Sequence, residues 1–189
     1  MRVFALFVIA ALSSAAQVGR DEVTDLDGRG VRPLDAAPGQ RATALVFMRA
    51  DCPLASQTAP EIDRVRALAA GRDVQVWLVY VDPEEPLERI RTQLADYGLK
   101  VSAVRDPDHA LVGRAGVHVT PEAALYVHEK SGARLVYRGR LDDRVVGLGR
   151  TRPRATRFDL REAIELALAG RATALVTTPA FGCEIADVR

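Results

Sequence analysis

The stretch ATALVFMRADCPLASQTAPEIDRVRALAAG, residues 42–71, is the most informative part of the sequence, because an apolar strand pattern leads directly into a helix pattern. Residues 42–48 form a continuous apolar run of strand length. Residues 54–70 place apolar side chains at helical spacings and stop at a glycine. Cys52 and Pro53 stand between the two patterns, where the helix is expected to begin.

Strand and helix patterns alternate on both sides of this stretch. Strands separated by helices imply a parallel βαβ unit, and a late hairpin adds an antiparallel pair to the same sheet. We therefore predict an α/β protein with a central mixed sheet flanked by helices. The other expected elements are an N-terminal β-hairpin around Asp27-Gly28, strands at 73–81 and 101–104, helices at 86–98 and through Arg114, two strands joined by a turn at 129–132, a surface loop at 141–157 and a helix at 158–170.

Residues 1–16 follow the pattern of a secretory signal peptide. One positive charge at Arg2 precedes an apolar run over residues 3–12, and small residues lead up to Ala16. A membrane anchor is the alternative, but the run is shorter than the roughly 20 residues that a spanning helix needs. We therefore expect cleavage after Ala16, a single periplasmic or secreted domain over 17–189, and no stable insertion of the mature chain into a membrane.

The charges of the mature chain balance. Of the 26 basic residues, Arg2 leaves with the leader, and the rest are matched by 25 acidic residues. No excess of positive charge directs the protein to nucleic acid or to anionic lipid. We therefore expect no nucleic-acid partner.

Cys52 has two interpretations at the strand-to-helix corner. It is either a small buried residue or a thiolate at the positive end of a helix. A thiolate is the nucleophile in disulfide exchange and peroxide reduction, and a helix N-terminus lowers the pKa of a cysteine. Pro53 suits the first helical position, where its missing N–H costs nothing. Arg49 adds a second positive field and Asp51 opposes both, so the direction of the net pKa shift stays open.

Three motifs carry a resemblance to a known family: LVFMRADCPLA, VTP at 119–121, and GARLVYRGRLDD. With them, the chain resembles the thioredoxin-like superfamily, in the redoxin group of peroxiredoxin-like and thiol-disulfide exchange proteins. It is most similar to exported peroxiredoxin-like proteins that pair DCP near the first helix with GC near the C-terminus, here Gly182-Cys183. The resemblance runs from about Asp21 to Ile185 and implies a thioredoxin-like fold.

The resemblance also implies roles for Thr120-Pro121. In this superfamily the bond before the matching proline is cis, lies against the active-site cysteine and keeps backbone groups free for a partner strand. A trans proline that starts an edge strand is the alternative. The sequence departs from the pattern of the family at two positions. Ala55 occupies the place of a second thioredoxin cysteine, and Arg49 stands where a typical peroxiredoxin has threonine.

Cys183 is the remaining candidate partner of Cys52. In one interpretation Cys52 attacks the substrate and Cys183, on a mobile tail, resolves the intermediate. In the other, the pair is a permanent staple. We expect the tail to fold back and bury Phe181 and Ile185, with Gly182 permitting a tight approach. The spacing leaves both interpretations of the pair open.

A metal site is an alternative of a different functional class. His118 lies two residues before Thr120, so on an extended strand both side chains point to one face, near Cys52. Two cysteines with a histidine make a copper-type ligand set, here Cys52, His118 and Cys183. Copper-delivering assembly factors of the respiratory oxidase share the fold, but they place two cysteines close together near the first helix.

We therefore expect an exported thiol-based oxidoreductase that performs thiol-disulfide exchange or peroxide reduction. Its expected partners are a protein thiol or disulfide, or a peroxide, and no cofactor or metal is expected. The alternative is a non-catalytic binding domain or copper carrier. The expected site consists of Cys52 as nucleophile, Cys183 as resolving partner, Thr120, Pro121 and Arg49.

Overall fold

The computed structural model describes residues 21–147 and 149–186. The expected signal peptide, residues 1–16, lies outside these residues. Within the described ranges, no helix is both long enough and apolar enough to cross a bilayer.

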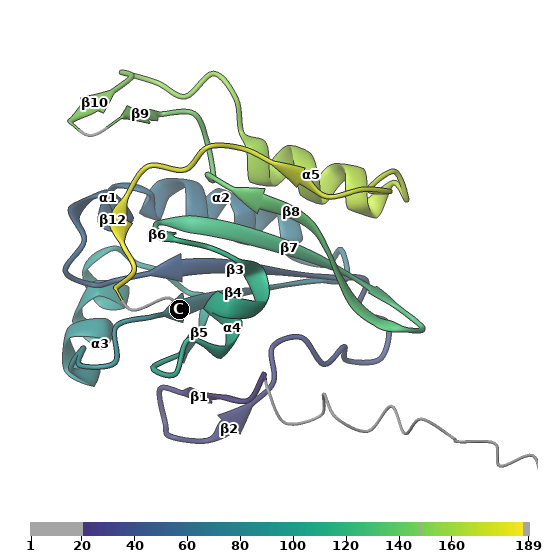
Figure 1. Ribbon diagram of the computed structural model, residues 1–189, viewed down its shortest axis with the longest axis horizontal. Helices are drawn as coiled ribbons and strands as arrows, with labels where there is room; N and C mark the ends of the chain where they lie inside the picture. The colour runs from purple at the N-terminus through teal and green to yellow at the C-terminus, as the bar shows by residue number, and fades with distance from the viewer. Residues whose placement is uncertain (1–20, 148, 187–189) are drawn as a thin grey trace, which may run out of the picture.

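An eight-stranded mixed sheet forms the centre of the molecule (Figure 1). Its strands are β1 (Val23–Asp25), β2 (Gly30–Val31), β3 (Ala42–Met48), β4 (Val74–Tyr80), β5 (Ser102–Arg105), β7 (Glu122–Glu129), β8 (Gly132–Gly139) and β11 (Val176–Thr177). Their order across the sheet is β11-β8-β7-β3-β4-β5-β1-β2. β3, β4 and β5 are parallel, and β7 runs antiparallel to both β3 and β8. The predicted α/β class and the N-terminal hairpin of β1 and β2 are confirmed.

β3 is buried along its whole length because apolar layers cover both faces of the sheet. Ala44 and Val46 belong to the apolar cluster on one face, and Leu45 and Phe47 to the cluster on the other. Successive strand residues point to opposite faces, so a strand covered on both sides is apolar at every position. This explains the unbroken apolar run that the sequence shows here.

Helices supply the two covering layers. They are α1 (Pro53–Gln57), α2 (Ala59–Ala69), α3 (Leu87–Asp96), α4 (Ala110–Ala115) and α5 (Asp159–Leu168). Ile62 of α2, Ile90 of α3 and Leu160 of α5 join the cluster that contains Val46. Leu111 of α4 joins the opposite cluster. The sheet is therefore packed between helices, as predicted.

The single helix expected over 54–70 is wrong, because the chain forms α1 and α2 with a break at Thr58. Pro60 lacks an N–H, and its ring clashes with the carbonyl four residues earlier in a continuous helix. The hydroxyl and the N–H of Thr58 both donate to the carbonyl of Ala55, at 2.6 and 3.1 Å, and so close α1. Cys52 therefore heads a helix of only 5 residues.

The segment 141–157 is more ordered than the surface loop that we expected. It contains a two-stranded hairpin of β9 (Val145–Gly147) and β10 (Arg150–Thr151). The buried carboxylate of Asp143 accepts hydrogen bonds from the hydroxyl and N–H of Thr156, both at 2.6 Å, and from the N–H of Arg157. Chiefly the Thr156 hydroxyl holds the pKa of Asp143 well below its ordinary value. One buried acid thus organises the whole segment.

The chain after α5 returns across the molecule (Figure 1). It first adds β11 to the edge of the large sheet, parallel to β8. It then forms β12 (Cys183–Glu184), which pairs antiparallel with β6 (Val119–Thr120). The expected fold-back of the tail is confirmed, and it brings Cys183 to the edge of β6.

Candidate functional site

Cys52 lies at the turn after β3 and caps α1. Its backbone is extended, with φ −86° and ψ 113°, and Pro53 occupies the first turn of the helix as predicted. The residue is 1% exposed. Its position at the carboxyl end of a central strand places the sulfur at the edge where β3 and β4 both end.

The Thr120-Pro121 bond is cis and lies against this cysteine. The Sγ of Cys52 is 3.3 Å from the carbonyl oxygen of Thr120. Because a disulfide sulfur carries no hydrogen, this is a packing contact and not a hydrogen bond. Thr120 is buried, and among the described residues its hydroxyl finds no hydrogen-bond partner.

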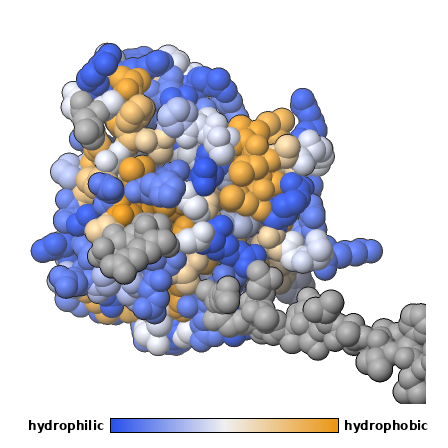
Figure 2. Space-filling model, in the orientation of Figure 1, coloured by the Kyte–Doolittle hydropathy of each residue, from blue (hydrophilic) through white to orange (hydrophobic). Residues whose placement is uncertain are grey.

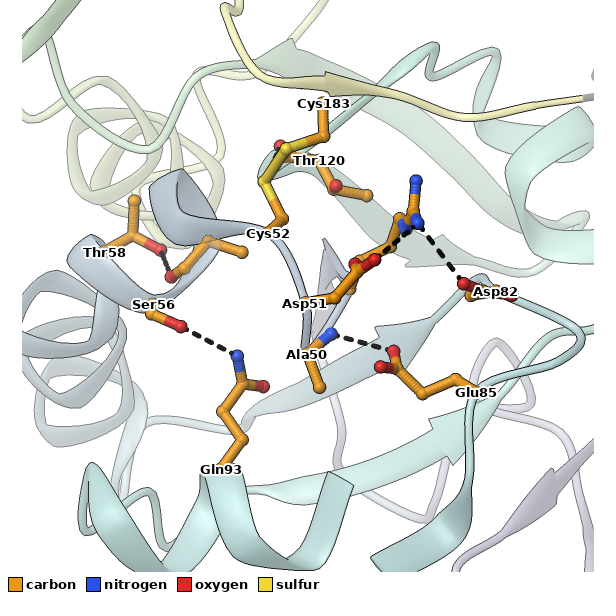
Figure 3. The surroundings of a disulfide bond; sticks show 12 residues. Ala50, Asp51, Cys52, Ser56, Thr58, Asp82, Glu85, Gln93, Thr120 and Cys183 are labelled. Atoms are coloured by element: carbon orange, nitrogen blue, oxygen red, sulfur yellow. Dashed lines mark hydrogen bonds and ion pairs between the residues drawn. A yellow bond between two sulfur atoms is a disulfide. The ribbon is translucent and has the colours of Figure 1, made fainter. Parts of the chain in front are cut away.

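Cys52 and Cys183 form a disulfide across 131 residues of sequence (Figure 3). Their Cα atoms are 6.2 Å apart, within the range of ordinary disulfides. β12 holds Cys183 directly opposite Thr120. Cys183 is partly exposed whereas Cys52 is buried, so Cys183 carries the more accessible sulfur.

The flanks of Cys183 differ in how far they match the expected docking. Ile185 is 5% exposed and joins the apolar cluster on the α4 face, as predicted. Phe181 is 37% exposed, so its expected burial is wrong. Gly182 passes so close to the chain opposite that an added Cβ would lie 2.2 Å from the carbonyl oxygen of Thr120. The tail is therefore fixed by backbone contact and one aliphatic side chain.

Arg49 lies between two carboxylates. Its guanidinium is 2.8 Å from Asp51 and 3.3 Å from Asp82. These two acids offset the positive field that we expected Arg49 to exert on Cys52. The role of Arg49 at the thiolate therefore stays a prediction.

Glu85 is a buried acid beside the site that the sequence reasoning missed. It is 3% exposed, and its Oε2 accepts the N–H of Ala50 at 2.8 Å, two residues before Cys52 (Figure 3). Burial raises the pKa of this carboxyl, and the nearby Asp51 and Asp82 act in the same direction. The available signal was the acidic run DPEE directly after β4, because neighbouring parallel strands end at the same edge.

A chain of side-chain hydrogen bonds connects α1 to α3 and β4. The hydroxyl of Tyr80 donates to Gln93 Oε1 at 2.7 Å, and Gln93 Nε2 donates to the Ser56 hydroxyl at 3.1 Å. Tyr80 lies at the end of β4 and Gln93 on α3. The short helix that carries Cys52 is thus tied to two neighbouring elements.

His118 does not approach the cysteines as a ligand. Its side chain is exposed, and its backbone N–H donates to the carboxylate of Glu122 at 2.9 Å. Across the part of the chain that the structure describes, no three His, Cys, Asp or Glu side chains are placed to hold a metal ion. The sulfurs of the suggested copper set are bonded to each other.

An apolar cleft lies away from the disulfide, between α5, β8 and the returning tail. Its volume is about 160 Å³, and Leu166 and Val176 on its rim are exposed. Figure 2 shows hydrophobic surface gathered over this part of the molecule. The residues that line this cleft include no cysteine or histidine.

Comparisons with known proteins support the fold. No family model matches the sequence, and no curated protein matches it. Among solved structures, a hypothetical protein from Sinorhizobium meliloti is 26% identical with a TM-score of 0.70, covering 87% of this chain and 88% of its own. A thioredoxin-like protein from Aeropyrum pernix is 21% identical with a TM-score of 0.51, covering 79% of this chain and 88% of its own.

A third structure is a secreted Mycobacterium tuberculosis disulfide oxidoreductase homologous to E. coli DsbE. It is 17% identical with a TM-score of 0.50, covering 80% of this chain and 96% of its own. At these identities the likeness establishes the fold. The chain therefore has a thioredoxin-like fold.

Proposed function

We propose that the protein is a thiol-disulfide oxidoreductase that works through Cys52 and Cys183. The observation that carries this proposal is the disulfide itself, which closes against the cis-proline edge where a partner strand would dock. A bond placed only to tie down a tail has no need of that position. The similarity to a disulfide oxidoreductase fold is in keeping with it.

In the oxidising direction, a partner thiolate attacks the more accessible sulfur, that of Cys183. The Cys52–Cys183 bond breaks, Cys52 leaves as thiolate, and a mixed disulfide forms on Cys183. A second partner thiolate then attacks the partner sulfur in this mixed disulfide. The partner gains a disulfide and loses two electrons and two protons, and both cysteines of the protein end as thiols.

In the reducing direction, Cys52 acts as the nucleophile. Release of the tail uncovers its sulfur, the thiolate attacks a partner disulfide, and Cys183 resolves the mixed disulfide that results. We further propose that this occurs outside the cytoplasm after removal of residues 1–16, because disulfides persist in oxidising compartments. The protein partner is thus a thiol or a disulfide of another chain.

The test is a trapping experiment with native insulin, whose disulfides are intact, as the model disulfide substrate. Reduced Cys183→Ser protein should form a mixed disulfide with an insulin chain through Cys52, detected by mass spectrometry of a non-reducing digest. Cys52→Ser protein should show at least about tenfold less adduct, because Cys183 does not cap the N-terminus of a helix as Cys52 does. Equal adduct from both variants, or none from either, would contradict the assignment of Cys52.

Peroxide reduction is tested in the same preparations. Arg49 stands where a typical peroxiredoxin has threonine. We therefore expect hydrogen peroxide to oxidise the reduced protein at least about tenfold more slowly than the disulfides of native insulin do. Rapid peroxide turnover that survives Cys183→Ser would assign the protein to peroxide chemistry and would show that the tail cysteine is not needed.

A further inference from the structure

The tail occupies the edge of β6 as an extended peptide. Cys183 and Glu184 pair antiparallel with Thr120 and Val119. The N–H of Ile185 donates to the carbonyl of His118 at 2.9 Å. Backbone pairing of this kind accepts any extended segment, whereas selectivity comes from the side chains that the edge accommodates. The sequence of the tail therefore indicates which side chains the edge of β6 accommodates.

The residue before the cysteine has no room for a side chain. A Cβ on Gly182 would lie 2.2 Å from the oxygen and 2.6 Å from the carbonyl carbon of Thr120. The obstacle is buried backbone that precedes Pro121 and does not rotate away as a side chain would. Gly182 is not in the left-handed region of φ, so the close approach and not the backbone conformation requires glycine.

The second residue after the cysteine enters an apolar site. Ile185 packs in the cluster that contains Val81 and Val117. A cleft of about 80 Å³ beside it is lined by Val81, Pro83 and His109, among others. Alternate residues of an extended segment share a face, so a cysteine aimed at Cys52 carries its second successor into this site.

The residue between them, Glu184, is exposed and lies on the opposite side of the strand from its two neighbours. Phe181, which precedes the glycine, is exposed as well. The position of Glu184 in a bound segment therefore carries no steric requirement. The edge thus accommodates glycine, cysteine, any residue and an aliphatic residue, in that order.

We propose that the reduced protein binds, in place of its own tail, extended partner segments of the pattern Gly-Cys-x-aliphatic. This inference rests on the proposed function and names its substrate class. The Cys52 thiolate attacks the sulfur of the partner cysteine, a mixed disulfide forms, and the other partner sulfur leaves as thiolate. Cys183 then attacks Cys52 and releases the partner cysteine as a thiol. The returning tail thereby refills the edge with the same pattern that it displaces.

The experiment uses the full chain with Cys183→Ser and four short peptides. Their sequences are FGCEIA, FACEIA, FGCEAA and FGCAIA, each activated as the mixed disulfide with 2-nitro-5-thiobenzoate. Attack by Cys52 on the peptide sulfur releases the coloured thiolate, which gives the rate. FACEIA and FGCEAA should react about tenfold more slowly than FGCEIA, and FGCAIA within about twofold of it.

A second variant tests competition with the tail. In the Cys183→Ser background, Ile185→Ala weakens the tail but leaves the edge intact, so all four peptides should react faster and in unchanged order. The reaction of Cys52 with 5,5′-dithiobis(2-nitrobenzoate) serves as control. Equal peptide rates with a reactive Cys52 would overturn the selectivity alone. An unreactive Cys52 would overturn the proposed function and the selectivity together.

Discussion

At the scale of single residues, Cys52 is surrounded by features that oppose one another. The cap position and Pro53 favour a thiolate, but α1 is short, and the helix field weakens with the loss of aligned peptides. The carboxylates of Asp51 and Asp82 offset Arg49. The proposed reactivity of Cys52 therefore depends more on its position at the helix cap and on its burial than on a strong positive field.

The first prediction concerns the buried acid Glu85. Burial raises its pKa, so the folded protein binds this proton more tightly than the unfolded chain does, and stability falls as the pH rises through the ordinary and then the raised pKa. Glu85→Gln keeps an oxygen for the Ala50 N–H but carries no charge. Its free energy of unfolding relative to wild type should therefore increase from about pH 4 to pH 8.

The measurement is urea denaturation of both proteins across this pH range. Glu84→Gln is the matched control, because Glu84 is the neighbouring acid and is exposed. The control should follow the wild-type curve. A constant difference between Glu85→Gln and wild type at every pH would show that Glu85 does not titrate differently in the folded protein.

The structural positions of single residues could be predicted from the sequence where neighbouring residues in the chain determine them. The cap at Cys52 and the strand start at Pro121 follow from neighbours in the chain, together with the family resemblance. Glu85 was missed because its burial depends on where the end of β4 lies beside the end of β3. The exposure of Phe181 likewise depends on distant parts of the chain and has no local signal.

At the scale of elements, β12 depends on the absence of a side chain at Gly182. Gly182→Ala should push the tail from the edge of β6, because the new methyl group meets the Thr120 carbonyl. The disulfide then closes less often, and its equilibrium with glutathione should move at least about tenfold towards the dithiol. The readout is the fraction of cross-linked 52–183 peptide after alkylation.

The matched control for this change is Glu184→Ala in the same strand. The Glu184 side chain is exposed, so its loss should leave the equilibrium within about twofold of wild type. A Gly182→Ala protein that behaves like this control would show that the tail shifts freely and that the close approach is not required.

The ordered segment between β8 and α5 gives a second prediction at this scale. Asp143→Ala removes the acceptor of the N–H groups of Thr156 and Arg157, of the Thr156 hydroxyl and of the Arg152 guanidinium, and should lower the free energy of unfolding by about 2–4 kcal/mol. Asp142→Ala is the control, because among the described residues Asp142 accepts a hydrogen bond only from the N–H of Arg144, and its loss should cost less than about 1 kcal/mol. Both variants are measured by thermal and urea unfolding. Equal losses of stability in Asp143→Ala and Asp142→Ala would contradict the central position of Asp143.

Element types were predictable, and their interruptions less so. The apolar run of β3 and the amphipathic patterns of α3 and α5 carry their own periodicity. The break between α1 and α2 had a local signal in Pro60, which the apolar spacing across 54–70 obscured. The order within 141–157 had none, because it comes from Asp143 meeting Thr156 and Arg157 through the loop.

In the molecule as a whole, the disulfide joins the turn between β3 and α1 to β12, near the end of the described residues. It closes a loop of 131 residues, which restricts the unfolded chain strongly. Cys183→Ser should lower the free energy of unfolding by about 2–5 kcal/mol. Wild-type protein kept reduced should match the variant in urea denaturation. Equal stability of the oxidised and reduced wild type would show that the tail is held without the bond.

Reversible reduction of the Cys52–Cys183 bond in the folded protein distinguishes a redox-active disulfide from a structural one. The full chain is equilibrated in glutathione buffers of increasing reducing power, quenched in acid, alkylated and digested without reductant, and the 52–183 cross-link is quantified. A redox-active bond should show a reversible transition with a midpoint above about −300 mV, while the fold persists by circular dichroism. A bond that glutathione reduces only after the protein is unfolded in denaturant would instead be a structural staple, and the proposed function would be wrong.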